Sequence, residues 1–298
     1  MRGAAFAILA VLLAVPRAGY AQGVDSTYIP IVIGLNGSVR SAGLHGAGTA
    51  LVGDAGSIFY NPACLATIRH IALEGSYFRD ASGAHQETLA GAWRLKQFDL
   101  GGGVKSFTVP GDSATGGTAD QEYLAVGSAV YRFGLFAFGG SAKVLRRTAS
   151  GISQRAVGGD VGMAIAVFDI AALGFSIENI QGNWDHNSPI VLPRLTRLGF
   201  TMNYVDPQET FRLLSTVEVQ WPQSQDTRVV VGLEGGAVVF GAGVLGRIAY
   251  GSRPAGTNES RFSLGASVAL GKLVLDYAYE PTGPLGNEDH RFGARLTL

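Results

Sequence analysis

The most constraining feature of this chain is an alternation of apolar and polar residues with a period of two, which continues from His70 to Leu298. Successive side chains of a β-strand point to opposite faces, so this period predicts strands that each have one apolar face. The predicted strands lie near 70–78, 86–95, 97–108, 120–131, 133–145, 153–168, 170–179, 195–204, 211–221, 226–234, 236–250, 261–270, 272–280 and 291–298. Segment 120–131 has no clear apolar face. An even number of strands is what a closed antiparallel barrel requires.

The connections between these segments alternate in length. The odd connections are long and rich in turn-forming residues: 79–85, 110–118, 147–151, 181–189, 222–226, 251–258 and 281–287. The even connections are short and centre on Lys96, Arg132, Asp169, Gly235 and Gly271, with 205–209 as the exception. Outer-membrane barrels have long extracellular loops and short periplasmic turns, whereas a soluble β-sandwich has no reason to sort its loops in this way. The sequence therefore predicts an all-β fold, a transmembrane antiparallel β-barrel of about 14 strands over residues 70–298.

The N-terminal residues have the features of a secretory signal. Arg2 supplies the positive charge, residues 4–15 form an apolar core, and Gly19 and Ala21 are small residues at the usual cleavage positions. Cleavage after Ala21 would remove residues 1–21. The apolar core is too short for a membrane-spanning helix, and no later apolar run is long enough for one. An exported chain of this kind is either soluble or crosses a membrane as strands, here the outer membrane of a Gram-negative type of cell.

Charge, cysteine and glycine content exclude several other classes. Lys+Arg and Asp+Glu number 23 each, so no nucleic-acid partner is expected. Cys64 is the only cysteine, so no intrachain disulfide can form. The 43 glycines have no three-residue period, which excludes collagen. A hydrophobic content of 47% excludes a disordered glycine-rich tract.

The two faces of the predicted strands suggest a lumen and a lipid contact. The polar face carries charges of both signs: Glu74, Arg94, Asp99, Lys105, Asp160, Glu178, Arg197, Arg212, Glu218, Arg228, Glu234, Arg247, Arg261, Lys272, Asp276, Glu280, Arg291 and Arg295. We interpret them as a wet, ion-paired interior, because an ion filter needs one sign of charge at a constriction. The apolar face carries aromatic residues, several near strand ends, as in an aromatic girdle or a soluble core: Tyr77, Trp93, Tyr204, Trp221, Tyr250, Tyr277 and Tyr279.

Residues 22–69 lack the long period of two and are predicted as a separate N-terminal plug. Asp54 is placed to cap a short helix through Ser57 and Ile58. Asn61 and Pro62 start a turn and end any helix there. The segment is too short for an independent domain but long enough to plug a barrel mouth. We expect Asp54, Asn61 and Pro62 to fix this plug, which is a structural role.

Small residues around Asp54, followed by an aromatic residue, Asn61, Pro62 and Ala63, resemble the N-terminal signature of the PorV/PorQ family. The sequence at 275–279, 283–287 and 290–292 is similar to the end of that family. These outer-membrane proteins are related in architecture to the FadL transporters, which have fourteen strands and an N-terminal hatch. Two departures are Cys64, where the family usually has Gly, and Leu298, where barrel-assembly signals prefer Phe.

None of the sequence motifs supports an enzymatic reaction. Gly241, Gly243 and Gly246 match a dinucleotide fingerprint in spacing, but they lie inside an alternating strand rather than between a strand and a helix. The histidines lack metal-ligand spacing, and the neighbours Asp185 and His186 lie in a loop without a nucleophile motif. We therefore expect no catalytic residue, no metal and no cofactor.

Three functions remain open for a barrel of this kind, which would have outer-membrane lipid as a partner in any case. The PorV/PorQ resemblance implies a non-catalytic component of type IX secretion that binds exported cargo proteins and secretion subunits at its loops and rim. The FadL architecture implies a transporter of small hydrophobic molecules, in which the hatch shifts to release the ligand. A crowded ionic wall is a poor lining for an acyl chain, which favours the first function. The third function is a purely structural barrel.

Overall fold

The computed structural model describes residues 28–111, 119–167, 170–205, 211–253 and 257–298. It contains fourteen strands: β1 Ile71–Asp80, β2 His85–Leu95, β3 Phe98–Val109, β4 Asp120–Phe133, β5 Phe136–Ala149, β6 Ile152–Val167, β7 Ala171–Glu178, β8 Leu195–Val205, β9 Phe211–Pro222, β10 Arg228–Val239, β11 Ala242–Gly251, β12 Phe262–Leu270, β13 Leu273–Glu280 and β14 Asp289–Thr297. The predicted strand number is confirmed. Residues 1–27, which include the expected signal and its cleavage site, lie outside the described part.

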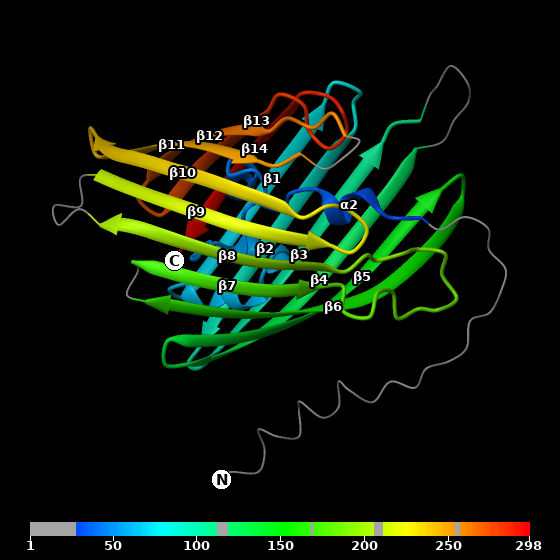
Figure 1. Ribbon diagram of the computed structural model, residues 1–298, viewed down its shortest axis with the longest axis horizontal. Coiled ribbons are helices and arrows are strands. Elements are labelled where there is room, and N and C mark those ends of the chain that lie inside the picture. The colour runs from blue at the N-terminus through cyan, green and yellow to red at the C-terminus, as the bar shows by residue number, and fades with distance from the viewer. Residues whose placement is uncertain (1–27, 112–118, 168–169, 206–210, 254–256) are drawn as a thin grey trace, which may run out of the picture.

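The strands form one closed antiparallel barrel (Figure 1). Each strand pairs with its neighbours in the sequence, and β14 closes the ring by pairing with β1 from Ala72 opposite Thr297 to Asp80 opposite Asp289. A closed ring leaves no strand edge, which is the requirement for strands in a bilayer. The predicted closed antiparallel barrel of fourteen strands is therefore the fold of this chain.

Most described connections sort by length as expected, but three differ from the prediction in position or length. The turn between β10 and β11 lies at Phe240 and Gly241 rather than at Gly235, and both residues have positive φ angles, 51° and 80°. Gly235 is a strand residue of β10. The turn predicted at Arg132 lies two residues later, between β4 and β5. The connection predicted at 147–151 is a tight turn at Ser150 and Gly151, because β5 and β6 extend further than the alternation indicated. Asp169 and residues 206–210 are not described.

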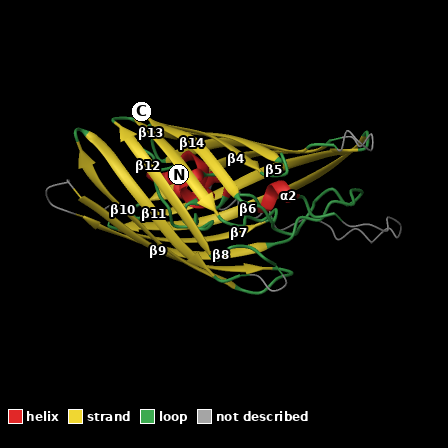
Figure 2. Ribbon diagram, turned by 90° about the horizontal axis from the view of Figure 1, so that it is seen from above, coloured by secondary structure: helices red, strands yellow, loops and turns green. Residues whose placement is uncertain are grey.

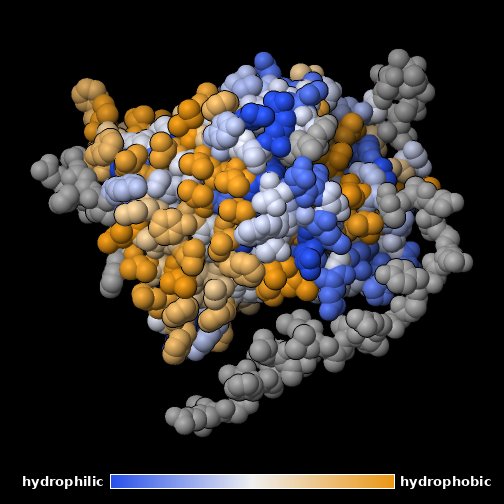
Figure 3. All heavy atoms as spheres, viewed as in Figure 1, coloured by the Kyte–Doolittle hydropathy of each residue, from blue (hydrophilic) through white to orange (hydrophobic). Residues whose placement is uncertain are grey.

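The two faces of the barrel wall differ in polarity as the alternation predicted. Outward residues are mostly apolar and exposed, such as Leu89, Trp93 and Leu233. Figure 3 shows hydrophobic side chains over much of the visible wall and hydrophilic ones towards the long-loop end. Inward residues include charged side chains that are nevertheless buried, such as Glu74 and Arg247. None of the described helices is long and apolar enough to span a membrane.

Residues 28–69 run through the inside of the barrel as four short helical turns (Figure 2). These are α2 Ile31–Gly34, α3 Val39–Ala42, η1 Ala55–Phe59 and η2 Pro62–Thr67. We call residues 28–69 the hatch. Apolar hatch residues such as Ile58 and Leu65 share one buried cluster with inward residues of the wall such as Phe107 and Leu145. The main apolar core of the described chain therefore lies between the hatch and the wall.

Candidate functional site: the interface between hatch and wall

The hatch crosses the lumen from one mouth to the other. At the mouth with the long loops, Tyr28 forms a parallel backbone bridge with Ile190, in the connection between β7 and β8. At the mouth with the short turns, the Arg94 guanidinium donates a hydrogen bond to the Ala66 carbonyl at 2.5 Å. The hatch is thus fastened at both ends, and its middle meets the charged wall.

Asp54 joins two arginines that come from different parts of the chain. Arg40 of α3 lies 2.7 Å from one carboxylate oxygen, and Arg295 of β14 contacts the other. Asp54 occupies the N-cap position of η1, but its side chain makes no capping hydrogen bond, so the expected cap is wrong. Burial opposes ionisation, yet the charges of Arg295 and Arg40 lower the pKa of Asp54 to about 2. The carboxylate is therefore charged and serves an ion pair between hatch and wall.

The ion pairs continue around the wall as a network of alternating charges. Arg40 also lies 2.9 Å from Glu234 of β10, which in turn lies 2.6 Å from Arg247 of β11. Arg247 and Arg295 both contact Asp276 of β13, at 3.3 and 2.6 Å. Buried charges are tolerated only when paired, and here the hatch arginine completes the pairing. The sequence could place the wall charges on one face but not their hatch partners.

Asn61 and Pro62 shape the start of η2. The Asn61 side chain accepts a hydrogen bond from the Ala63 amide at 3.1 Å, as an N-cap residue does. Its amide group donates to the carbonyls of Thr49, at 2.9 Å, and Met163 of β6, at 3.1 Å. Pro62 occupies the first turn of η2, where its missing N–H costs nothing. Asn61 thus connects two parts of the hatch with the wall.

Wall carboxylates also bind backbone amides of the hatch. Glu218 of β9 accepts from Gly48 and Thr49, both at 2.9 Å. Glu74 of β1 accepts from Gly56 at 2.8 Å. Glu122 of β4 accepts from Val32 at 2.7 Å. Glu122 is missing from the predicted lumen charges because β4 carries apolar residues on both faces, so the sequence did not show which face was inward.

Inward glycines let the hatch backbone approach the wall closely. A Cβ atom at Gly139 of β5 would lie 2.7 Å from the Ala63 nitrogen and 2.9 Å from the Pro62 carbonyl carbon. A Cβ at Gly162 of β6 would collide with the Asn61 side chain, and one at Gly174 of β7 with the Thr49 carbonyl. Part of the high glycine content is therefore explained by the fit of the hatch.

His45 packs near the long-loop mouth. Its ring lies against Gly251 of β11, and the Arg228 guanidinium donates to its Nε2 at 3.3 Å. Burial and the positive charge of Arg228 lower the pKa of His45 to about 4. The hatch is thus built for a neutral histidine at this position.

Most predicted inner charges face the lumen, as expected. The exceptions are Arg261, just before β12, and Lys272, in the turn between β12 and β13, which are both exposed. Lys143 faces inward and pairs with Asp160 at 2.7 Å, which the sequence did not indicate. In the described residues, no group of three or more His, Cys, Asp or Glu side chains is placed to hold a metal ion.

Comparisons with known proteins identify the fold. No family model and no curated protein sequence matches the chain. The monoaromatic hydrocarbon channel CymD has a TM-score of 0.61 and 11% identity, over 90% of this chain and 98% of that chain. The toluene transporter TodX of Pseudomonas putida has a TM-score of 0.57 and 9% identity, over 88% and 97%. A FadL homologue of Pseudomonas aeruginosa has a TM-score of 0.59 and 13% identity, over 91% and 99%. The chain therefore has the FadL-type barrel fold that the resemblance implied.

Proposed function

We propose that this chain is an outer-membrane channel for small hydrophobic molecules, with residues 22–69 as its hatch, residues 70–298 as its barrel and residues 1–21 as a signal cleaved near Ala21. The observation that carries the proposal is a closed barrel with its N-terminal segment inside, in a fold shared with a toluene transporter and a hydrocarbon channel. Both are transport proteins, which supports a non-catalytic role. Asp54, Asn61 and Pro62 would fix the hatch in its closed position.

The docked hatch leaves a lumen that a hydrocarbon would avoid. Its centre is occupied by the paired charges of Arg40, Asp54, Glu234 and Arg295, and apolar molecules gain nothing from such surroundings. The apolar side chains of the hatch, including Ile58 and Leu65, are buried against the wall. Transport in this proposal requires the hatch to leave this position, which breaks its ion pairs and exposes apolar surface to the substrate.

Uptake of radiolabelled toluene by Gram-negative cells that lack their own hydrocarbon channel tests the proposal. Cells producing the chain should take up toluene faster than cells with an empty vector, and Asp54→Asn should increase the rate further by loosening the hatch. Heat-modifiable gel migration of the outer-membrane fraction confirms that both proteins are folded. Rates equal to the empty vector for both folded proteins would reject the channel.

A second candidate is the PorV/PorQ-type role in secretion of exported proteins. The charged lumen favours it, since ionic groups such as Glu234 and Arg247 suit a closed structural barrel better than a hydrocarbon path. Affinity purification from gently solubilised outer membrane separates the two candidates. Co-purification of surface-exported cargo or secretion subunits would support this role, whereas bound hydrophobic small molecules without protein partners would support the channel.

A further inference from the structure

A hollow in the outer wall follows a row of glycines across neighbouring strands. Gly91 of β2 lies opposite Gly102 of β3, Gly102 lies opposite Gly127 of β4, and Gly127 lies opposite Ala142 of β5. All four positions face outward, and the first two, Gly91 and Gly102, line the hollow. A Cβ atom at Gly127 would meet nothing within 4 Å, and one at Gly102 only the Val126 carbonyl oxygen at 3.9 Å. We call this hollow the furrow.

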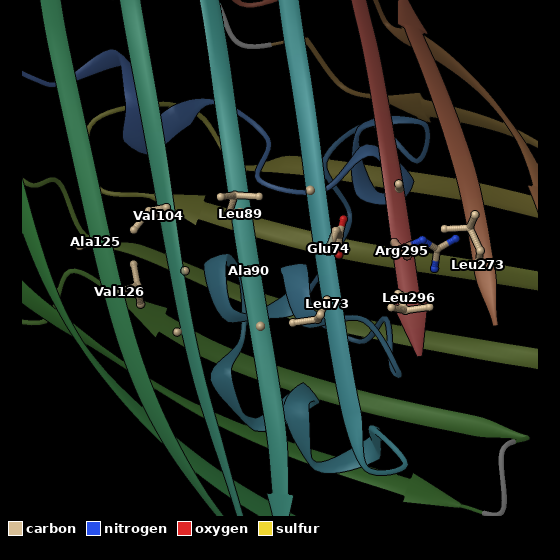
Figure 4. A pocket seen from close by; sticks show the side chains of 15 residues that line it. Leu73, Glu74, Leu89, Ala90, Val104, Ala125, Val126, Leu273, Arg295 and Leu296 are labelled. Atoms are coloured by element: carbon tan, nitrogen blue, oxygen red, sulfur yellow. The ribbon is translucent and has the colours of Figure 1, made fainter. Parts of the chain in front are cut away.

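Apolar side chains border the furrow and give it volume. Leu89 lines the furrow and is 64% exposed. Trp93 follows Gly91 by two residues on the same outward face of β2, beside the furrow, and is 56% exposed. The cavity holds about 660 Å³ and extends over β1 and β14 to Leu273 of β13. Figure 4 shows Leu89 and Val104 on β2 and β3, with the hatch helices behind this part of the wall. The hollow is open to the outside of the wall, as a groove for a single chain would be.

No charge reaches the furrow from the residues that line it. Glu74 and Arg295 contribute to its lining, but their charged groups point into the barrel. The Glu74 carboxylate accepts a hydrogen bond from Gly56 of the hatch, and Arg295 pairs with Asp54 and Asp276. An occupant of the furrow therefore meets hydrocarbon groups only.

Basic residues gather at the short-turn rim below the furrow. Arg69, Lys96 and Lys272 are exposed there, and Lys272 directly precedes Leu273, which lines the furrow. Backbone hydrogen bonds place their strand ends side by side: Thr297 donates to Lys272 at 3.1 Å, Leu298 to Ile71 at 2.8 Å, and Arg94 to His70 at 2.8 Å.

The positive charge of this rim is not balanced by exposed acidic side chains. In residues 66–72, 92–100, 129–137, 270–274 and 294–298 the only acidic side chain is Asp99, which is fully buried. The α-carboxylate of Leu298 adds one negative charge, so the three exposed basic side chains leave the rim positive. The other described turns at this end, at Gly134 and Leu135 and at Phe240 and Gly241, carry no charge. An apolar furrow with a basic rim at one end matches an acyl chain with an anionic head.

We propose that the furrow and the basic rim bind one anionic phospholipid of the periplasmic leaflet. Its acyl chain lies in the furrow, and its anionic head group lies at the rim that carries Arg69, Lys96 and Lys272. The short turns mark the periplasmic side of an outer-membrane barrel. The head group is then at the surface of that leaflet, where basic residues attract anionic lipids. This lipid site depends on the barrel lying in the outer membrane but not on what the channel carries.

Quenching of Trp93 fluorescence by brominated lipid tests the site. The chain has three tryptophans, and Trp184→Phe with Trp221→Phe leaves Trp93 beside the furrow as the only one. The protein is placed in vesicles of zwitterionic phosphatidylethanolamine that contain a small fraction of phosphatidylglycerol brominated in its acyl chains. We expect the association constant of the brominated phosphatidylglycerol at Trp93 to exceed that of brominated phosphatidylethanolamine by on the order of tenfold.

Two sets of variants examine the tail and head contacts separately. Gly102→Leu with Ala125→Leu fills the furrow and should lower the association of both brominated lipids. Its matched control, Gly246→Leu on the outward face of β11, meets nothing within 4 Å and should change neither. Arg69→Gln with Lys96→Gln and Lys272→Gln should reduce the preference for the anionic lipid to about one. Heat-modifiable migration verifies that each variant is folded.

Three outcomes would overturn the proposal. The first is equal quenching by both brominated lipids in the parent protein. The second is relief of the quenching by toluene at low concentration, which would assign the furrow to a transported molecule. The third is a dimer in analytical ultracentrifugation that Gly102→Leu dissociates, which would assign it to a second copy of the chain.

Discussion

At the scale of single residues, one carboxylate decides how firmly the hatch is held. Asp54 neutralises Arg40 of the hatch and Arg295 of the wall, which are both largely buried. Without Asp54, Arg40 and Arg295 keep Glu234 and Asp276 as partners, but the buried network has one positive charge too many. Loss of one partner from a buried ion pair costs about 3–5 kcal/mol. We therefore expect Asp54→Asn to destabilise the docked hatch by about 3 kcal/mol. The backbone hydrogen bonds between the barrel strands should not change.

The buried thiol of Cys64 provides the measurement. Cys64 is fully buried in η2 and donates to the Thr49 carbonyl at 3.0 Å, so a thiol reagent reaches it only when the hatch opens. Asp54→Asn should speed its reaction with dithiodipyridine about a hundredfold. Asp185→Asn is the control, since the described residues give the Asp185 side chain one ion pair, with the exposed Arg155 at 3.6 Å, and one hydrogen bond from the Asn187 amide within its own loop. Equal rates in Asp54→Asn and the parent protein would show that this ion pair does not hold the hatch.

His45 makes hatch docking dependent on pH. Its pKa is about 4 in the docked hatch, against about 6.5 for an exposed histidine, because burial and Arg228 disfavour its charged form. The docked state binds fewer protons, so docking is strongest above pH 6.5 and weakens as the pH falls. The loss reaches about 3 kcal/mol near pH 4.

The ratio of Cys64 reaction rates in the parent protein and His45→Gln isolates this effect, because the pH dependence of the reagent cancels. The ratio should rise steadily between pH 6.5 and 4 and stay constant above pH 7. A ratio that does not change with pH would mean that His45 is not buried as a neutral ring.

At the scale of elements, substitutions at two adjacent glycines of β5 test the fit of the hatch independently of the stability of the strand. Gly139 faces inward against Pro62 and Ala63, and Gly140 faces outward with its nearest neighbour, the Asp160 carbonyl oxygen, at 3.9 Å from an added Cβ. Overpacking costs about 1–3 kcal/mol. Gly139→Ala should therefore speed the Cys64 reaction about tenfold or more, and Gly140→Ala should leave it unchanged. Similar rates in both variants would show that the hatch does not rest on this strand.

The strands of the barrel could be predicted because their pattern is local. The contacts of the hatch with the wall could not be predicted, because they join residues far apart in the sequence. The alternation of each strand lies within its own residues, so β12, β13 and β14 can be predicted without knowing their neighbours. The turn at Phe240 was missed because Gly235 and Gly236, which suggested a turn, are accommodated in the strand. The partners Asp54 and Arg295 are 241 positions apart, and no sequence period connects them. Asn61 and Pro62 were identifiable as a turn, but the contact of Asn61 with Met163 depends on the closed ring.

At the scale of the whole molecule, the wall and the hatch are two bodies with separate sources of stability. The wall is closed by backbone pairing from β1 round to β14. The hatch is held by buried ion pairs, by carboxylates on its backbone amides and by close packing against glycines. The hatch contacts can therefore weaken without opening the ring, which is the division a gated channel needs.

This division predicts that loosening the hatch opens a conducting lumen. Asp54→Asn combined with Gly139→Leu removes an ion pair and forces η2 away from β5, while β5 retains its pairing with β4 and β6. The vacated lumen would be lined by charged and polar groups and filled with water, as in porins. In planar bilayers we expect the parent protein to stay closed and the double variant to conduct ions. Gly140→Leu with Asp185→Asn serves as the matched control and should stay closed. If the double variant migrates as a folded barrel but does not conduct, the hatch is not the gate, and the charged lumen serves only to hold the barrel in shape.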